Sequence, residues 1–221
     1  MARASFQTEL PLDFGTYTDL EALRAAAASC KRCMLWRHAT QTVFGEGPPN
    51  ASLVLVGEQP GDKEDLAGHP FVGPAGAILD KALKDAKIPR AQAYVTNAVK
   101  HFKNEPRGKR RLHKRPDPNE IRICSAWLRR EIQIIEPKLV VALGATAAYA
   151  LLSRTITIRD SRQQIFSSPD GFSIVVTNHP SAILRMSDDE SRRQAYSHLV
   201  EDFVWIRSHG LSKRATRQRA L

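Results

Sequence analysis

The three cysteines of the chain have a spacing that suits metal binding or redox chemistry. Two lie close together in Cys30-Lys-Arg-Cys33, and Cys124 lies far along the chain. Three cysteines cannot form a disulfide framework without leaving one thiol unpaired. In a reducing compartment a Cys-x-x-Cys pair is typical of a zinc site, an iron–sulfur cluster or a redox pair. The pattern alone leaves these three alternatives open.

A glycine- and proline-rich stretch begins at Gly57. The string Gly57-Glu-Gln-Pro-Gly61 permits tight turns whose backbone amides a ligand can approach, although an ordinary turn between a strand and a helix has the same composition. The stretch continues to Phe71, which is surrounded by prolines and glycines. A phenylalanine in such a loop either plugs the core or offers a face on which a nucleobase stacks.

Two short segments carry the net charge of +10. Residues 102–118 hold seven Lys or Arg and two acids, and residues 207–221 hold five Lys or Arg and no acid, so the rest of the chain is neutral. A neutral domain with two cationic segments indicates a polyanionic partner. For the terminal segment a solubilising tail is the simpler explanation, whereas the internal segment lies among other candidate functional residues.

Four apolar, β-branched runs are predicted to be strands, at residues 52–57, 93–97, 138–144 and 173–178. Continuous runs of this kind suit strands that are buried on both faces of a parallel sheet. A capping box at residues 18–21 predicts a helix that ends near Ser29. Further helices are predicted at residues 75–86, 119–135, 146–152 and 188–207.

The alternation predicts an α/β fold with three layers, α/β/α, around a central four-stranded parallel sheet. Residues 154–172 are expected to form an irregular connection or a hairpin. We expect one domain over residues 1–206, followed by a basic tail at 207–221.

Each predicted strand ends in polar or glycine-rich residues. These are Gly57, Asn97, the string Gly144-Ala-Thr146 and the string Asn178-His-Pro-Ser181. Because the carboxyl ends of parallel strands meet at one edge of a sheet, we expect a single cleft there. Gly144 also opens a helix, whose N-terminus suits either a phosphate or plain packing.

The composition excludes several classes of protein. With 42% hydrophobic and 25% charged residues, the chain has a core and is neither disordered nor fibrous. It contains no apolar run of about 18 residues, as a membrane span requires, and residues 1–10 do not resemble a signal peptide. We therefore expect a soluble, cytoplasmic monomer without a membrane partner.

Taken together, the motifs resemble those of the uracil-DNA glycosylase superfamily, close to its iron–sulfur branch, family four. The resemblance covers residues 30–185 and rests on the strings Gly57–Asp62, Pro70–Gly76, Tyr94–Asn97 and His179–Ser181. Gln59, the string Val99-Lys-His-Phe-Lys103 and the string Lys109-Arg-Arg-Leu-His113 are similar to the UdgX subgroup. That subgroup excises uracil and stays covalently attached to the sugar through a histidine of this insertion.

The resemblance implies roles for individual residues. Asn97 would pair with uracil, Phe71 would stack on it, and His179 would donate to its O2 atom; Gly57, Asp62 and Ser181 complete the expected substrate-binding set. His113 would attack C1′ with Glu58 as its acidic partner, and neighbouring cations would keep its imidazole neutral. Gln59 is expected to fill space that a hydrolytic water needs. The expected DNA-binding residues are Lys109, Arg110, Arg111, Lys114 and Arg115.

The resemblance also implies a 4Fe-4S cluster. The family uses four cysteines, and this chain has His101 where the third ligand falls, so we expect Cys30, Cys33, His101 and Cys124 to hold the cluster in a structural role. Uracil-containing DNA, with single strands preferred, is the implied partner, and it would place the protein at the nucleoid. Two alternatives stay open at this point: a glycosylase that turns over without trapping, and a non-catalytic iron–sulfur DNA-binding protein.

Overall fold

The computed structural model describes residues 16–108 and 110–211. Its centre is a five-stranded sheet in the order β2-β1-β5-β7-β6. The strands are β1 (Leu53–Gly57), β2 (Ala93–Asn97), β5 (Leu139–Leu143), β7 (Ser173–Thr177) and β6 (Phe166–Ser167). The first four run parallel, and β6 pairs antiparallel with β7.

The predicted α/β fold with four parallel strands is confirmed, and the sheet has one strand more than predicted. The extra strand β6 has two residues and lies within the 154–172 region, after the short helix α6 (Ile158–Ser161). It covers part of the edge of β7, whose backbone groups would otherwise lack partners.

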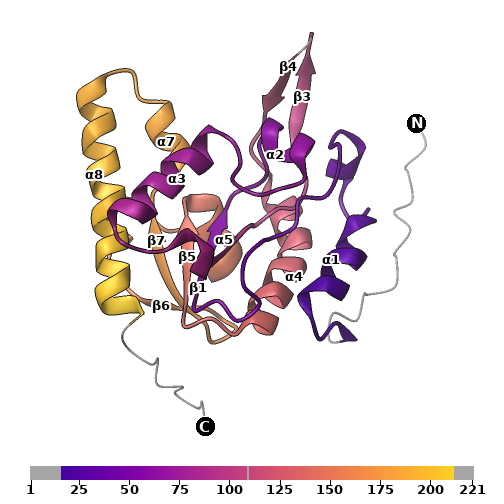
Figure 1. The fold of residues 1–221 in the computed structure, drawn as a ribbon. Coiled ribbons are helices and arrows are strands. Elements are labelled where there is room, and N and C mark those ends of the chain that lie inside the picture. Colours follow the sequence, from indigo (N-terminus) through magenta and orange to yellow (C-terminus); the bar gives the residue numbers. More distant parts are fainter. Residues whose placement is uncertain (1–15, 109, 212–221) are drawn as a thin grey trace.

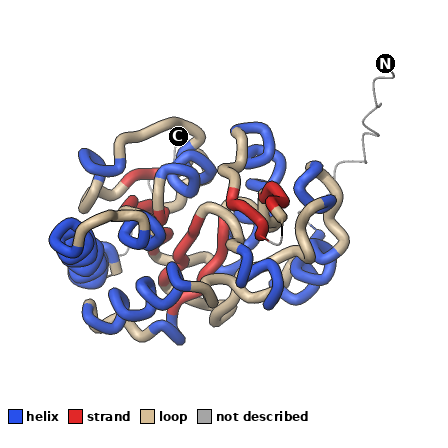
Figure 2. Tube along the Cα trace, turned by 90° about the horizontal axis from the view of Figure 1, so that it is seen from above, coloured by secondary structure: helices blue, strands red, loops and turns tan. Residues whose placement is uncertain are grey.

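Helices cover both faces of the sheet (Figures 1 and 2). One face packs against α1 (Leu20–Ala28), α4 (Pro118–Ile135) and α5 (Ala145–Leu152). The other packs against α3 (Pro74–Asp85), α7 (Pro180–Leu184) and α8 (Asp189–Trp205). Short helices lie at α2 (Asp62–Ala67), Met34–Arg37 and Arg90–Gln92.

Alternate residues of each strand enter different cores. In β1, Val54 and Val56 join the core under α4, while Leu53 and Leu55 join the core under α3. All four side chains are at most 3% exposed. Burial on both faces explains why these runs are uninterrupted rather than alternating in sequence.

The basic internal segment forms an antiparallel hairpin of β3 (Asn104–Arg107) and β4 (Arg110–His113). Among the described residues these two strands pair with each other and not with the central sheet. The register places Asn104 opposite His113 at the root of the hairpin. Figure 1 shows the hairpin projecting from the end of the molecule where β1 and β2 finish.

Both ends of the described chain differ slightly from the prediction. Asp19, rather than Thr18, is the N-cap of α1, and its side chain accepts a hydrogen bond from the amide of Ala22 at 2.8 Å. Helix α8 continues through a π-helical turn to Gly210, and Arg207 donates to the carbonyl of Ala86 at 2.8 Å. The remainder of the predicted basic tail, from residue 212, lies outside the described residues. No helix in the described ranges is long and apolar enough to cross a membrane.

Candidate active site

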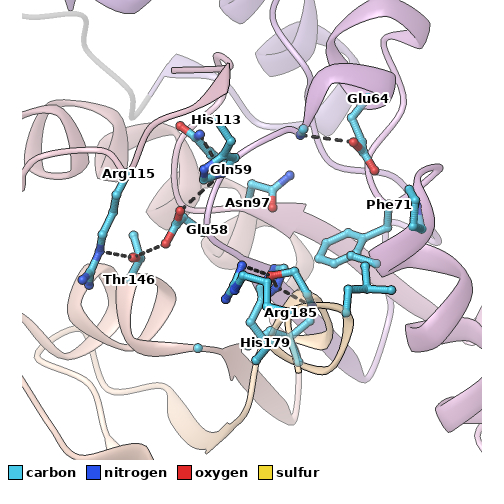
Figure 3. Close-up of a pocket in the computed structure, with 18 of the residues that line it drawn as sticks. Glu58, Gln59, Glu64, Phe71, Asn97, His113, Arg115, Thr146, His179 and Arg185 are labelled. Carbon is cyan, nitrogen blue, oxygen red and sulfur yellow. Dashed lines mark hydrogen bonds and ion pairs between the residues drawn. The ribbon is translucent and has the colours of Figure 1, made fainter. Parts of the chain in front are cut away.

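The strand register brings the predicted site residues to one edge of the sheet. Gly57 pairs with Asn97, and Leu143 pairs with Thr177, so the residues that follow these pairs surround one cleft. The cleft has a volume of about 900 Å³. Its lining includes Glu58, Gln59, Asp62, Phe71, Asn97, His113, Arg115, Thr146, His179, Ser181 and Arg185 (Figure 3). These residues line one cleft at the carboxyl edge of the sheet, where a cleft was expected.

The floor of the cleft is packed too tightly for any residue but glycine at position 57. A Cβ atom there would lie 2.4 Å from Asn97 Oδ1 and 2.6 Å from Phe71 Cζ. Phe71 is 8% exposed and has a left-handed backbone with φ of 58°. The Asn97 amide makes no hydrogen bond within the part of the chain that the structure describes and faces the cleft. A flat ring placed here meets an aromatic face and a free amide.

His179 presents one fixed ring nitrogen to the cleft. Its Nδ1 accepts from the Ser181 amide at 3.1 Å and lies 2.8 Å from Ser181 Oγ. Because a backbone amide can only donate, the proton of the neutral ring sits on Nε2. The pKa of His179 is lowered to about 4, mainly by burial and in addition by the charges of Arg185 and His113. The ring is therefore a neutral donor at physiological pH, and it stacks on Phe71 with centroids 6.1 Å apart.

Ser181 and Arg185 support His179. Arg185 Nη1 donates to Ser181 Oγ at 3.0 Å, which leaves the hydroxyl proton for the ring nitrogen. Ser181 was predicted to bind substrate; in this structure its hydroxyl and amide both orient the histidine. Sequence reasoning missed Arg185, although it follows Ser181 by one helical turn and so lies on the same face of α7.

Gln59 fastens the hairpin to the edge of the sheet. Its Oε1 accepts from the Lys103 amide at 3.1 Å, and its Nε2 donates to the carbonyls of Lys114 at 3.0 Å and Lys103 at 3.3 Å. These backbone partners fix which end of the carboxamide is the nitrogen. That nitrogen also lies 2.9 Å from His113 Nε2. The nitrogen has two hydrogens, and its two shorter contacts are those to His113 Nε2 and the Lys114 carbonyl, so the longer contact with the Lys103 carbonyl gives way. When it donates to His113, Nε2 of the histidine carries the lone pair.

A polar chain ends at the same histidine. Arg115 Nε donates to Thr146 Oγ1 at 3.2 Å, and Thr146 Oγ1 donates to Glu58 Oε2 at 2.5 Å. The other carboxylate oxygen of Glu58 lies 3.5 Å from His113 Nε2. Arg115 was predicted to bind DNA, and here its guanidinium supports the carboxylate through Thr146. This series of hydrogen bonds positions the Glu58 carboxylate to stabilise any positive charge that develops beside His113.

The pKa of His113 is lowered, as predicted, but for a different main reason. Burial of the ring is the largest cause, Glu58 opposes it, and Arg185 lowers the pKa further. The predicted neighbouring cations were those of the hairpin, whereas Arg185 lies on the other side of the cleft. The His113 side chain keeps 49% of its surface exposed, so a substrate can reach it.

The hairpin cations differ from one another in their surroundings. Arg111 pairs with Asp62 at 2.7 Å and with the buried Asp65 at 2.5 Å, so its charge is used to hold the hairpin against α2. Lys114 pairs with Glu105 at 2.5 Å near the surface. Arg110 is exposed, and Lys109 lies outside the described residues.

Glu64 is a further residue that sequence reasoning missed. Its two carboxylate oxygens accept from the amides of Gly61 at 3.1 Å and Gly73 at 2.7 Å, so one side chain ties together the two glycine loops beside Phe71. The signal was present in the sequence, because Glu64 follows Gly61 by three residues at the start of a helix.

The three cysteines are near enough to act on one another, since Cys33 and Cys30 both raise the pKa of Cys124. The Trp127 indole donates to Cys30 Sγ at 3.3 Å, and the Lys100 amide donates to Cys124 Sγ at 3.2 Å. Burial raises the pKa of Cys124 to about 12; Lys100 lowers it, and Cys33 and Cys30 raise it. His101 Nε2 lies 3.0 Å from Thr42 Oγ1. In the described ranges, no three His, Cys, Asp or Glu side chains are arranged to hold a metal ion.

A buried ion pair connects the cysteines to the cleft. Lys100 and Glu131 have side chains that are 1% and 0% exposed, and the lysine ammonium contacts the Glu131 carboxylate. The ammonium also donates to Thr96 Oγ1 at 2.6 Å and to the Asn97 carbonyl at 3.0 Å. These hydrogen bonds hold the end of β2, which carries Asn97, on the side that faces away from the cleft.

Comparison with known proteins agrees with this geometry. A family model described as the uracil DNA glycosylase superfamily matches residues 44–204. A type-4 uracil-DNA glycosylase of Sulfurisphaera tokodaii is 37% identical over 75% of this chain and 76% of its own length. Another of Thermotoga maritima is 33% identical over 86% of this chain and 96% of its own. A type-5 uracil-DNA glycosylase of Thermus thermophilus is 29% identical over 61% of this chain and 73% of its own. The chain belongs to the uracil-DNA glycosylase superfamily.

Proposed function

We propose that this protein excises uracil from DNA and captures the resulting sugar covalently on His113. The excision is supported by family membership and by the type-4 relatives. The capture is supported by one observation above all: Gln59 holds the lone pair of His113 Nε2 at the cleft, 3.5 Å from the Glu58 carboxylate.

Base recognition uses the floor of the cleft. A base that has left the stack must be held through its Watson–Crick edge and against an apolar face. The Asn97 amide offers one donor and one acceptor, which match O4 and N3–H of uracil. Phe71 supplies the stacking face.

Bond cleavage uses the neutral form of His179. As the bond between C1′ and N1 breaks, its electron pair moves to the uracil ring and negative charge develops at O2. The Nε2–H group of His179 donates to that oxygen, and its lowered pKa keeps the ring neutral, so it stabilises the developing charge as a hydrogen-bond donor. The sugar becomes an oxocarbenium-like cation beside Glu58.

Capture follows because the His113 imidazole is already at the cleft when the sugar cation forms. The lone pair of His113 Nε2 leaves the hydrogen bond with Gln59 and forms a bond to C1′, and the positive charge passes from the sugar to the ring, which becomes an imidazolium. The Glu58 carboxylate stabilises this charge, and the Nδ1 proton can then be lost to solvent. A neutral imidazole held within about 3–3.5 Å of its target is a better nucleophile than water.

We propose that Cys30, Cys33, Cys124 and His101 hold a 4Fe-4S cluster. The sulfurs of Cys30 and Cys124 already accept N–H hydrogen bonds, which stabilise thiolate ligands. When bound, the cluster would supply a structural cross-link rather than electrons, because base excision needs no redox step. His101 would have to turn from Thr42 to complete the set.

The test is a denaturing gel of protein mixed with single-stranded DNA that contains one uracil. Capture gives a heat-stable band of higher mass, and a nucleotide-bearing tryptic fragment containing residue 113 identifies the bond by mass spectrometry. An abasic product without a shifted band would favour turnover without capture. Absence of free uracil in a single turnover would contradict excision altogether.

The variant His113→Ala separates the two steps. We expect it to release uracil without forming the adduct, with slow hydrolysis as water enters the vacated space. His209→Ala is the matched control, because His209 is exposed and stacks on Trp205 away from the cleft. Adduct formation at the wild-type level in His113→Ala would remove this histidine from the mechanism.

A further inference from the structure

The second half of α1 and the loop after it carry positive charge without any acid. Residues 22–45 contain four Lys or Arg and no Asp or Glu. Arg24 is used internally, because it donates to the Gly45 carbonyl at 2.7 Å and lies over the Phe44 ring. Lys31 and Arg37, by contrast, are exposed. This charge is separate from the two cationic segments that dominate the sequence.

A tryptophan holds these two cations together. Lys31 Nζ lies 5.0 Å from the centroid of the Trp36 ring, and Arg37 Cζ lies 5.7 Å from it. Both distances are typical of cation–π contacts. The indole is partly buried and therefore provides a firm support for two mobile side chains. We call Lys31, Trp36 and Arg37 the Trp36 patch.

The patch is close to the residue proposed to capture the sugar. Asn104 Nδ2 donates to the His38 carbonyl at 2.9 Å, and Asn104 pairs with His113 across the hairpin ladder. Paired Cα atoms in such a ladder lie about 4.5–5.5 Å apart, so the loop that contains His38 contacts the residue directly opposite His113. Figure 1 shows this loop beside the root of the hairpin.

Nearby carboxylates do not cancel the charge of the patch. Asp117 and Glu120 lie at the start of α4, and both pair with Lys103, at 3.4 and 2.8 Å. They also cap the helix, since Asp117 accepts from the Glu120 amide at 2.9 Å. With Lys103 these two carboxylates leave one net negative charge, fewer than the two positive charges of the Trp36 patch.

We propose that the Trp36 patch binds the phosphates of the single strand on one side of the nucleotide in the cleft. Lys31 and Arg37 contact two phosphates, and Trp36 keeps both cations in place. The proposal rests on the proposed function for the position of the strand. It makes the cluster-bearing loop part of the DNA-binding surface.

The experiment measures binding to single strands that contain 2′-fluoro-2′-deoxyuridine, in which the fluorine slows loss of the base. Three strands are compared: a trinucleotide, and two longer strands extended on the 5′ or the 3′ side. For Lys31→Ala/Arg37→Ala we expect weaker binding to one extended strand and unchanged binding to the trinucleotide. For single strands each phosphate contact contributes about 0.7 to the slope of log Kd against log salt concentration, so loss of two contacts lowers this slope by about 1.4. At about 0.1 M salt, relative to 1 M, this corresponds to a roughly 25-fold increase in Kd.

Two further variants test the role of the indole. Trp36→Ala should lose part of the same affinity, and Trp36→Phe should restore it because an aromatic face remains. Lys84→Ala/Lys138→Ala is the matched control, since both lysines are exposed and lie near the opposite edge of the sheet. Iron content and visible absorbance of each variant, equal to wild type, show that the loop has kept its fold.

The proposal is overturned if the double variant keeps the wild-type salt slope on both extended strands. It is also overturned if the loss is equally large for the trinucleotide, because the variant would then act through the cleft. Failure of the proposed function has a different signature: wild-type protein releases no uracil from a normal deoxyuridine strand, whatever the binding data show.

Discussion

Replacing Gln59 by alanine should separate excision from capture. The carboxamide is 7% exposed and makes two good hydrogen bonds to the hairpin backbone, to the Lys103 amide and the Lys114 carbonyl. Each such bond contributes about 0.5–1.5 kcal/mol, so the closed hairpin should lose about 1–3 kcal/mol. At 1.4 kcal/mol per factor of ten, the rate of adduct formation should fall roughly 5- to 150-fold.

Uracil release should fall much less, because Asn97, Phe71 and His179 do not depend on the hairpin. The assay is a single-turnover reaction in which free uracil and adduct are measured in the same sample. Gln41→Ala is the matched control, since Gln41 also donates to two carbonyls, those of Asp65 and Leu66, but does not contact the hairpin. An unchanged ratio of adduct to free uracil in Gln59→Ala would refute the reasoning.

Three further predictions follow from the packing and charges. Gly57→Ala should abolish excision while leaving iron content unchanged, because its Cβ would displace the ring of Phe71; wild-type uracil release would show that the floor adapts. Glu131→Leu leaves the Lys100 ammonium buried and unpaired, so the free energy of unfolding should fall by about 3–5 kcal/mol, and Lys100→Met/Glu131→Leu should recover much of it in urea titrations. If the double variant is less stable than Glu131→Leu, the pair is not the source of the loss. Because the pKa of His113 is lowered and its neutral form is the nucleophile, the adduct rate should rise with pH through a midpoint below 6.5 and be flat above it; a midpoint above 6.5 in single-turnover kinetics would contradict this.

The central sheet could be predicted because its strands are buried on both faces. Uninterrupted runs such as residues 52–57 leave few alternatives to a parallel strand, and the rule that ligands bind at the carboxyl edge then brings Gly57 and Asn97 together. The position of His179 in the cleft followed from the same rule. These features depend on local pattern and on topology alone.

The hairpin and its contacts could not be predicted in the same way. Its strands, for example Asn104–Arg107, have no apolar alternation, so periodicity gives no signal. The partners of Arg111, Asp62 and Asp65, lie more than forty positions away in sequence, and a run of cations gives no hint that one of them is internally paired. Likewise nothing in the sequence of α4 indicates that Glu131 faces a buried lysine.

The self-contained ladder of β3 and β4 has a consequence for how the two chemical tasks are divided. Its strands share no backbone hydrogen bonds with the central sheet in the described ranges, and the side chains of Gln59, Arg111 and Asn104 attach it to the body of the domain. Under the proposed function, selection of the pyrimidine would depend on the central sheet, and retention of the sugar would depend on the hairpin. We expect that the hairpin can be lengthened, shortened or exchanged without disturbing the pairing of β1 with β2, which aligns Gly57 with Asn97.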